Sequence, residues 1–140
     1  MNYLLDTCAV SELVKKRPEQ KVVRWINACS EDALFLSALT LGEIQKGISK
    51  LPDTARRLTI QEWLDSDLKA RFTERILPVS LEVALTWGLI EGESAVKGRP
   101  LPTIDALIGA TAITYNLTVV TRNVQDIKAT GARTLDLWAS

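Results

Sequence analysis

The chain has no histidine among its 140 residues, and this absence excludes several classes of enzyme. Ser-His-Asp triads, Cys-His pairs, ribonucleases that use two histidines and HExxH zinc sites all require an imidazole. Carboxylate chemistry is the main alternative that remains. Carboxylates gathered in one place usually hold a hard cation such as Mg²⁺ or Mn²⁺.

Cysteines, net charge and long apolar runs are also scarce. Two cysteines, Cys8 and Cys29, are too few for a disulfide framework, so we expect free thiols and a cytoplasmic location. The 17 basic and 17 acidic residues balance, so any nucleic-acid-binding surface must be local. The apolar runs are short and interrupted by charges, and the N-terminus lacks a basic segment and a long apolar stretch. We therefore expect no membrane span and no signal peptide.

Short apolar segments alternate along the chain with segments of helical periodicity. We predict strands at residues 2–5, 33–36, 76–79, 117–120 and 134–137. We predict helices at residues 8–14, 19–29, 40–51, 54–72, 80–96 and 103–113, and a helical turn at 123–128. The length suits one domain over residues 1–140. Buried strands separated by helices favour a three-layer α/β/α fold with a short, mostly parallel central sheet.

Four acids stand where an apolar segment meets the start of a predicted helix: Asp6, Glu43, Asp105 and Asp126. In open parallel sheets, sites form beyond the carboxyl ends of the strands, so all four acids can reach one edge of the sheet. Polar side chains accompany them at the same edge, namely the supporting residues Thr7, Thr121, Arg122 and Asn123.

Each acid also has an ordinary structural explanation. Two lie in capping-box patterns, Thr40–Glu43 and, more weakly, Asn123–Asp126. Asp6 suits a helix cap, and Asp105 lies in the first turn after a predicted Thr103 cap, where an anion favours the helix dipole. Two carboxylates about 5 Å apart repel by roughly 3 kcal/mol at an effective dielectric of about 20, more than the approximately 1 kcal/mol that a cap contributes. Acids that converge therefore need a cation or a proton, and convergence is the test.

At these residues the chain resembles PIN-domain ribonucleases of the VapC type, the toxin halves of type II toxin–antitoxin pairs. Four ordered blocks carry the resemblance over essentially the whole chain: Leu4–Thr7, Ser37–Glu43, Thr103–Ala112 and Val119–Asp126. Asp6, Glu43 and Asp105 fall on the family's three firmest acidic positions. The last block departs from the pattern, because many members carry an acid where this chain has Asn123. The resemblance leaves the fourth position open between Asp126 and Asn123.

The resemblance implies a PIN-like fold and an endoribonuclease that cleaves RNA, often a particular tRNA or rRNA loop. It implies Mg²⁺ or Mn²⁺ held by Asp6, Glu43, Asp105 and Asp126. It also implies a cognate antitoxin that covers the site, and a homodimer. Basic residues that we consider as RNA contacts are Lys15, Lys16, Arg17, Lys46, Lys50, Lys97 and Arg99, although each also suits a solvated helix end or loop. The helix at 54–72 and the Trp25 helix carry more apolar surface than a small sheet covers, which favours a dimer or an antitoxin groove.

Other functions fit the residues less well. A receiver-like signalling domain needs an acid pair after the first strand and a mid-chain strand that ends in aspartate, and the chain lacks both patterns. An Asp-x-Asp phosphatase would need an acid where Cys8 stands. A non-catalytic domain of doubly wound fold that only binds RNA or protein remains as an alternative.

Overall fold

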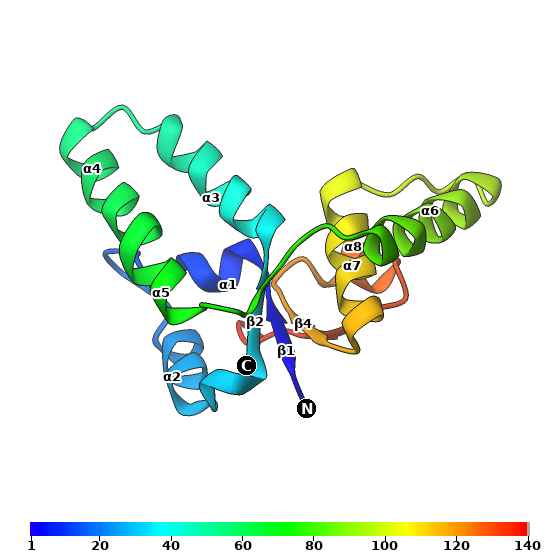
Figure 1. The fold of residues 1–140 in the computed structure, drawn as a ribbon, viewed down its shortest axis with the longest axis horizontal. Helices are drawn as coiled ribbons and strands as arrows, with labels where there is room; N and C mark the ends of the chain where they lie inside the picture. Colours follow the sequence, from blue (N-terminus) through cyan, green and yellow to red (C-terminus); the bar gives the residue numbers. More distant parts are fainter. Residues whose placement is uncertain (140) are drawn as a thin grey trace.

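A five-stranded sheet runs through the middle of the molecule (Figure 1). The computed structural model describes residues 1–139. Along the chain, the strands are β1 (Tyr3–Leu5), β2 (Leu34–Ser37), β3 (Ile76–Leu77), β4 (Thr118–Val120) and β5 (Arg133–Leu135). They lie in the order β3-β2-β1-β4-β5, and every neighbouring pair is parallel. The predicted α/β class with a mostly parallel sheet is therefore confirmed.

Helices cover both faces of this sheet. Those that follow β1 and β2 are α1 (Thr7–Ser11), α2 (Gln20–Ala28), the short 3-10 turn η1 (Glu31–Ala33), α3 (Ala38–Ser49), α4 (Thr54–Glu62), the π-helical η2 (Trp63–Leu68) and α5 (Lys69–Arg71). Those that follow β3 and β4 are α6 (Leu81–Val96), α7 (Thr103–Tyr115) and α8 (Val124–Lys128). In the described part of the chain, no helix combines the length and the apolar character needed to cross a membrane.

Side-chain alternation along the strands builds a separate core on each face. Leu5 and Val120 point to one face, where they pack with buried residues of α1, α2, α3 and η2. Leu4 and Val119 point to the other face and pack against α7 and α8. The register agrees, because β1 and β4 place Leu4 beside Val119 and Leu5 beside Val120. Alternate residues of fully buried strands thus supply both cores, as the continuously apolar strands require.

The structure corrects several details of the sequence-based prediction. The helix expected at 54–72 consists of α4, η2 and α5, and its Leu58 is 66% exposed. The helix expected to begin at Thr40 begins at Ala38, because Ser37 Oγ accepts a hydrogen bond from the Leu39 backbone N–H at 3.1 Å. Strand β5 begins at Arg133, one residue before the predicted start.

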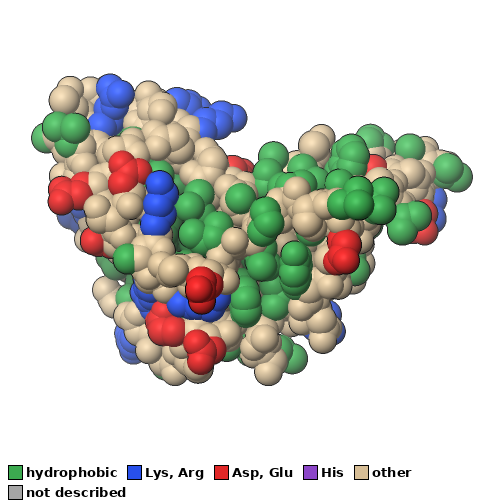
Figure 2. All heavy atoms as spheres, in the orientation of Figure 1, with side chains coloured by type: hydrophobic (Ala, Val, Ile, Leu, Met, Phe, Trp, Pro, Cys, Tyr) green, Lys and Arg blue, Asp and Glu red, His purple; other side chains and the backbone are tan. Residues whose placement is uncertain are grey.

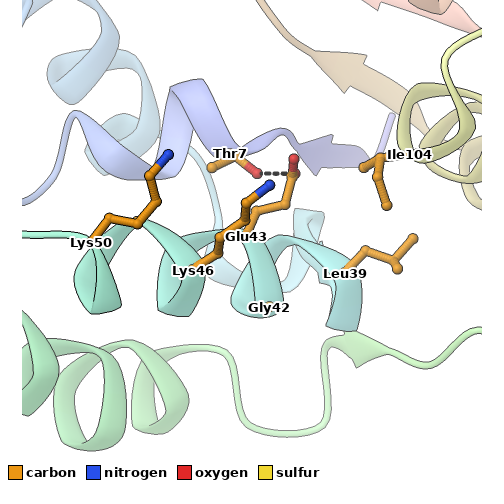
Figure 3. Close-up of a pocket in the computed structure, with 8 residues that line it drawn as sticks. Thr7, Leu39, Gly42, Glu43, Lys46, Lys50 and Ile104 are labelled. Carbon is orange, nitrogen blue, oxygen red and sulfur yellow. Dashed lines mark hydrogen bonds between the residues drawn. The ribbon is translucent and has the colours of Figure 1, made fainter.

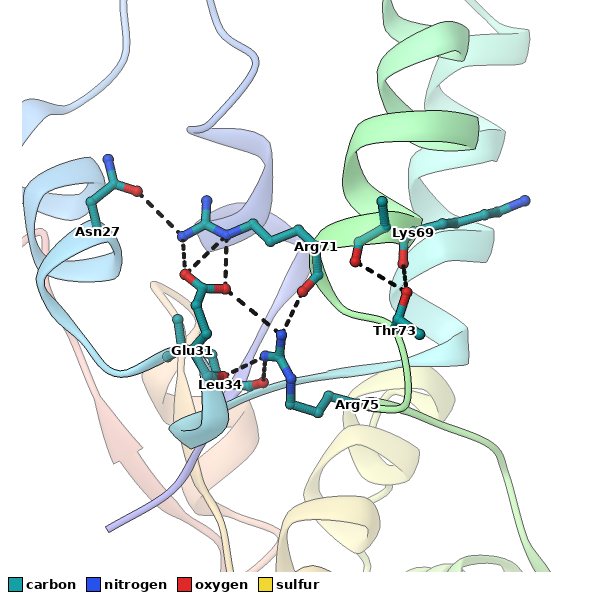
Figure 4. Close-up of polar contacts among 8 residues, drawn as sticks. Asn27, Glu31, Leu34, Lys69, Arg71, Thr73 and Arg75 are labelled. Carbon is teal, nitrogen blue, oxygen red and sulfur yellow. Dashed lines mark hydrogen bonds and ion pairs between the residues drawn. The ribbon is translucent and has the colours of Figure 1, made fainter.

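A polar network fixes the short edge strand β3 beside β2 (Figure 4). Arg71 donates from Nη2 to Glu31 Oε1 at 2.8 Å and from Nε to Glu31 Oε2 at 3.1 Å. Arg75 donates to the Leu34 backbone carbonyl at 2.6 Å and also to the carbonyl of Glu31. The hydrogen bond from Arg71 lowers the pKa of Glu31, against the smaller opposing effect of burial. Side chains thus support a strand whose own ladder is only two residues long.

The carboxyl edge of the sheet lies between two groups of helices (Figure 1). Helices α3 and α4 rise on one side of this edge, and α6 packs on α7 at the other side. The space-filling view shows a notch between the two groups (Figure 2). The residues that follow the strands, at the starts of the next helices, therefore lie in one concave region.

Candidate active site

Asp6 is held rigidly at the end of β1. It caps α1, because its Oδ1 accepts a hydrogen bond from the Thr7 backbone N–H at 2.9 Å. Its Oδ2 accepts a hydrogen bond from Thr121 Oγ1 at 2.8 Å, just beyond the end of the neighbouring strand β4. Asp6 is 8% exposed. Asp6 can therefore be both a helix cap and a site residue, since its carboxylate caps α1 and also lines the pocket described below.

Glu43 reaches from α3 across to α1. Its Oε1 accepts a hydrogen bond from Thr7 Oγ1 at 2.6 Å. The capping-box reading of Thr40–Glu43 is wrong, because Ser37 caps α3 and leaves Glu43 in the second turn. Thr40 is buried inside the helix, and its hydroxyl has no hydrogen-bond partner among residues 1–139.

Asp105 lies in the first turn of α7. Its Oδ2 accepts a hydrogen bond from Asn123 Nδ2 at 2.9 Å, and the Asn123 backbone N–H donates to Thr121 Oγ1 at 2.9 Å. The Thr103 cap was predicted wrongly: Thr103 is the first helical residue, and Pro102 holds the cap position without a side-chain bond. Asn123 thus links Asp105 to the Thr121 hydroxyl that also holds Asp6.

Three of the four predicted acids line one pocket of about 540 Å³. They come from three elements that are distant in sequence, and the pocket is completed by neighbouring polar side chains; its full lining is Asp6, Thr7, Cys8, Glu43, Asp105, Arg122 and Asn123. Asp126, on α8, is not part of this lining, whereas Asn123 is. The structure therefore brings Asn123 into the pocket and leaves Asp126 outside it.

The electrostatics of Asp105 report the convergence of the acids. Burial raises the pKa of Asp105, and the negative charges of Asp6, Asp126 and Glu43 raise it further, against the hydrogen bond from Asn123. The largest of these charges after burial is that of Asp6. The surroundings of Asp105 thus disfavour its negative charge, a condition that a bound cation or a proton would relieve.

The donor set suits a hard divalent cation. Carboxylate, amide and hydroxyl oxygens are the ligands that Mg²⁺ and Mn²⁺ prefer, and the lining supplies all three types. Within residues 1–139, no three acidic or cysteine side chains already stand at ligand distances from a common point. An ion here would draw the carboxylates together or bind some of them through water, as Mg²⁺ commonly does.

Cys8 is a pocket residue that the site prediction did not include. Its Sγ accepts a hydrogen bond from the Arg122 backbone N–H at 3.3 Å and lies 3.8 Å from Thr121 Oγ1. Burial raises the pKa of the Cys8 thiol, so the group stays protonated near neutral pH. Its position two residues after Asp6 is the only sequence signal that points to it.

A second pocket of about 520 Å³ continues from Thr7 and Glu43 along α3 (Figure 3). Lys46 and Lys50 lie along its α3 side, with their ammonium groups toward α1 (Figure 3). Gly47 leaves part of the helix surface bare, since a Cβ added there would meet nothing within 4 Å. The acidic pocket therefore opens directly onto a groove with basic side chains.

The remaining basic candidates lie elsewhere. Lys15 pairs with the buried carboxylate of Glu12 at 3.0 Å, so its charge is engaged within the fold. Lys97 and Arg99 line a separate pocket between the end of α6 and α8. Lys16 and Arg17 are exposed in the loop after α1.

Comparisons with known proteins agree with this fold. Residues 3–131 match the family model of the PIN domain, and the chain belongs to this family. It is 30% identical over 135 residues to the VapC ribonuclease Y4jK of Sinorhizobium fredii, covering 96% of both chains. It is also 30% identical to the toxin FitB of Neisseria gonorrhoeae, over 96% of this chain and 97% of that protein. The crystal structure of FitAcB from Neisseria gonorrhoeae superposes with a TM-score of 0.92 at 29% identity, covering 99% of both chains. These similarities identify the chain as a PIN-domain protein of the VapC type, and they do not support the receiver or phosphatase alternatives.

Proposed function

We propose that this protein is a metal-dependent endoribonuclease and the toxin of a toxin–antitoxin pair. The observation that carries the proposal is the pocket in which Asp6, Glu43 and Asp105 meet, beside a groove that holds two lysines. The names of its relatives, a VapC ribonuclease and the toxin FitB, support the same activity. We propose single-stranded segments of tRNA or rRNA loops as the substrate class, and the cytoplasm as the location, which the free thiols of Cys8 and Cys29 favour.

Each pocket residue has a role in this proposal. Asp6, Glu43 and Asp105 hold one or two Mg²⁺ or Mn²⁺ ions, with Asn123 in the pocket and Asp126 acting at longer range. When bound, such a cation lowers the pKa of water and stabilises the charge on the leaving oxygen. Hydroxyl hydrogen bonds hold two of these acids in place: Thr7 donates a hydrogen bond to Glu43, and Thr121 donates one to Asp6.

The metal site is tested by titrating Mn²⁺ into the purified protein in a calorimeter. We expect Asp105→Asn to weaken binding by more than about 100-fold, because a ligand is lost and second-shell changes alone cost about 10–100-fold. Asp126→Asn is the matched control, and we expect a loss of less than about tenfold because Asp126 does not line the pocket. Unchanged Mn²⁺ affinity in Asp105→Asn would favour the non-catalytic alternative. A larger loss in Asp126→Asn than in Asp105→Asn would return Asp126 to the centre of the site.

The groove with Lys46 and Lys50 is the proposed path for the RNA backbone. Each lysine that contacts a phosphate of single-stranded RNA releases counterions and adds about 0.7 to the slope of log affinity against log salt. We therefore expect the Lys46→Ala/Lys50→Ala double variant to lower this slope by about 1.4, measured by fluorescence anisotropy with a labelled oligoribonucleotide. Lys97→Ala/Arg99→Ala removes the same charge from the other pocket and should leave the slope unchanged. Equal slopes for the wild type and both variants would place the RNA elsewhere.

We propose an antitoxin as a partner that covers the acidic pocket. A third cavity of about 300 Å³ shares Thr7 and Glu43 with the two pockets above and runs between α1, α3 and α4. Its lining is mainly apolar, with Ile44, Ile48 and Trp63 among its residues. An apolar groove beside an anionic site suits a peptide segment with an apolar face and a basic residue, which could fill the groove and neutralise the acids together.

We propose a homodimer that forms through α6. On the Trp25 helix, one of the two helices expected to carry excess apolar surface, Trp25 packs edge-to-face on Tyr3 at 4.8 Å between ring centroids. Leu81, Leu85 and Leu89 instead form an exposed apolar stripe along α6 at a spacing of four residues. Hydrophobic side chains gather over this helix in the space-filling view (Figure 2). Such a stripe can pack against a second copy of itself about a two-fold axis.

Sedimentation velocity tests the dimer. Leu85→Lys should give a monomer with an unchanged circular dichroism spectrum, because Leu85 is 64% exposed and a lysine there meets water in the monomer but an apolar partner in the dimer. Leu58→Lys is the matched control on α4, where the side chain is 66% exposed, and should leave the dimer intact. A monomeric wild type, or a dimer that persists in Leu85→Lys, would contradict this interface.

A further inference from the structure

A buried carboxylate outside the acidic pocket ties the C-terminal segment to the start of the fold. Glu12 follows α1, and its side chain is 3% exposed. It accepts hydrogen bonds from the Glu19 backbone N–H at 3.0 Å, from Lys15 Nζ at 3.0 Å and from Trp138 Nε1 at 3.2 Å. Burial raises the pKa of Glu12, but these donors outweigh it, so that the pKa is lowered overall. A buried anion that is fully paired in this way holds its partners firmly, because each lost donor would leave charge unsatisfied.

The segment that carries Trp138 is fixed by further bonds. Asp136 Oδ1 accepts from the backbone N–H groups of Trp138 at 2.9 Å and Ala139 at 3.2 Å, which closes a tight turn. Lys21 Nζ donates to the Trp138 carbonyl at 2.9 Å. The indole ring also packs against the core cluster of α1, α2 and α3. The orientation of the ring is therefore set by contacts that come from both ends of the chain.

Arg122 lies over the indole ring of Trp138. The Arg122 guanidinium carbon lies 5.1 Å from the Trp138 ring centroid, and Arg122 also lines the acidic pocket. Within residues 1–139, its guanidinium forms neither an ion pair nor a hydrogen bond with any side chain, although three carboxylates line the same pocket. Stacking on an aromatic face orients a guanidinium without using its N–H groups, which lie in the plane at its edge. The donors of Arg122 thus stay free at the rim of the pocket.

We propose that Arg122 binds a phosphodiester oxygen of the substrate and that Trp138, locked by Glu12, is the residue that positions it. Arg122 is then a substrate-binding residue, and Trp138 and Glu12 are positioning residues in the C-terminal segment and in the loop after α1. A planar guanidinium that is already oriented loses less freedom on binding an anion than a free arginine does. The acids of the pocket would hold the cation, and Arg122 would bind the phosphate of the same substrate. This inference rests on the proposed ribonuclease function.

A double-mutant cycle on Arg122 and Trp138 tests the proposal. Binding of a labelled single-stranded oligoribonucleotide is measured in EDTA, and cleavage of the same RNA is measured with Mn²⁺. We expect Arg122→Gln to weaken binding about 10- to 30-fold, since it loses charge-assisted hydrogen bonds. Trp138→Leu should weaken it about fivefold by releasing the guanidinium. In the Arg122→Gln background, the same Trp138→Leu change should alter binding less than twofold, because Trp138 acts only through Arg122.

Two further variants separate positioning from a general structural role. Trp138→Phe lacks the Nε1–H donor to Glu12, as Trp138→Leu does, so the two variants should have comparable thermal stability. Because Trp138→Phe keeps an aromatic face under the guanidinium, it should bind RNA more tightly than Trp138→Leu. Trp87→Phe changes a tryptophan of α6 whose Nε1 has no partner among the described residues, and it should bind RNA as the wild type does. A Trp138→Leu penalty that is equal in both backgrounds, or wild-type binding by Arg122→Gln, would overturn the inference while the nuclease function stands. A wild type that neither binds nor cleaves RNA would overturn both.

Discussion

The Asp6→Asn variant is expected to lose RNA cleavage by at least about 10³-fold while it remains folded. Without this carboxylate, the transition state loses several kcal/mol of the charge stabilisation that a bound cation would bring. Each increase of about 1.4 kcal/mol in the activation free energy lowers the rate tenfold. The fold should survive, because an amide keeps the oxygen that accepts from the Thr7 backbone N–H. In the wild type, the Thr121 hydroxyl donates to Asp6. In the variant, this hydroxyl can rotate and accept a hydrogen bond from the new NH₂ group.

A matched control for this variant lies at the N-terminal cap of α4. Asp53 caps that helix by accepting from the backbone N–H groups of Ala55 at 3.0 Å and Arg56 at 3.3 Å, and it is exposed and outside the acidic pocket. Asp53→Asn therefore makes the same chemical change at another helix cap. Single-turnover cleavage of a labelled RNA, with circular dichroism of each protein, should find Asp53→Asn fully active. Full activity in Asp6→Asn would disprove the assignment of this pocket as the catalytic site.

The strands could be predicted from the sequence because they are buried on both faces. Consecutive residues such as Leu4 and Leu5 are both apolar, and they belong to the cores on opposite faces of the sheet. A short run of consecutive apolar residues is typical of a strand that is covered on both faces. The parallel order then followed from the helices between the strands. The first residues after β1 and β4, Asp6 and Thr121, had to lie near each other because β1 and β4 are neighbours in the sheet.

Helix starts could be predicted less well, because several residues nearby could cap each helix. Ser37 and Thr40 are both good caps, and the end of β2 at Ser37 decides between them. Because Ser37 is the cap of α3, Glu43 is not part of a capping box, and its carboxylate accepts a hydrogen bond from Thr7. At the last helix, Asn123 faces Asp105 because α8 begins only at Val124, a boundary that the local sequence does not fix.

Contacts between distant segments could not be predicted from one sequence. The bond from Trp138 to Glu12 joins residues 126 positions apart, and neither residue belongs to a recognisable motif. The exposed stripe on α6 was also missed, because leucines spaced by four favour burial unless the number of covering elements is known. Helical periodicity identifies an apolar face but does not identify what covers it.

The second large effect is expected on stability, at the contact between α7 and the end of α8. An ideal Cβ built at Gly109 would lie 2.5 Å from Thr130 Cβ and 2.7 Å from Thr130 Cγ2, closer than carbon atoms can approach. Thr130 is 6% exposed, and its hydroxyl donates to the Ile127 carbonyl and accepts from the Ala132 backbone N–H, so it cannot swing away freely. Gly109→Ala should therefore lower the free energy of unfolding by about 3 kcal/mol, the upper range for overpacking a core.

This glycine also sets the geometry of the site. Asp105 lies one turn before Gly109 on α7, and Asn123 immediately precedes α8, so a displacement of α7 from α8 would lengthen the bond between Asn123 and Asp105. We expect Gly109→Ala to weaken Mn²⁺ binding as well as to lower the midpoint of thermal unfolding by about 10 °C.

The control for Gly109→Ala is the same substitution in α6, where the expected change has the opposite sign. A Cβ at Gly88 would meet nothing within 4 Å, and Gly88 lies inside a helix. Gly88→Ala should raise the free energy of unfolding by about 0.5–1 kcal/mol, since alanine loses less backbone entropy on folding than glycine does. Chemical denaturation of both variants measures the two effects on one scale. If Gly109→Ala were as stable as Gly88→Ala, the close approach of α7 and Thr130 would be wrong, and with it the physical reason that α7 and α8 hold Asp105 beside Asn123.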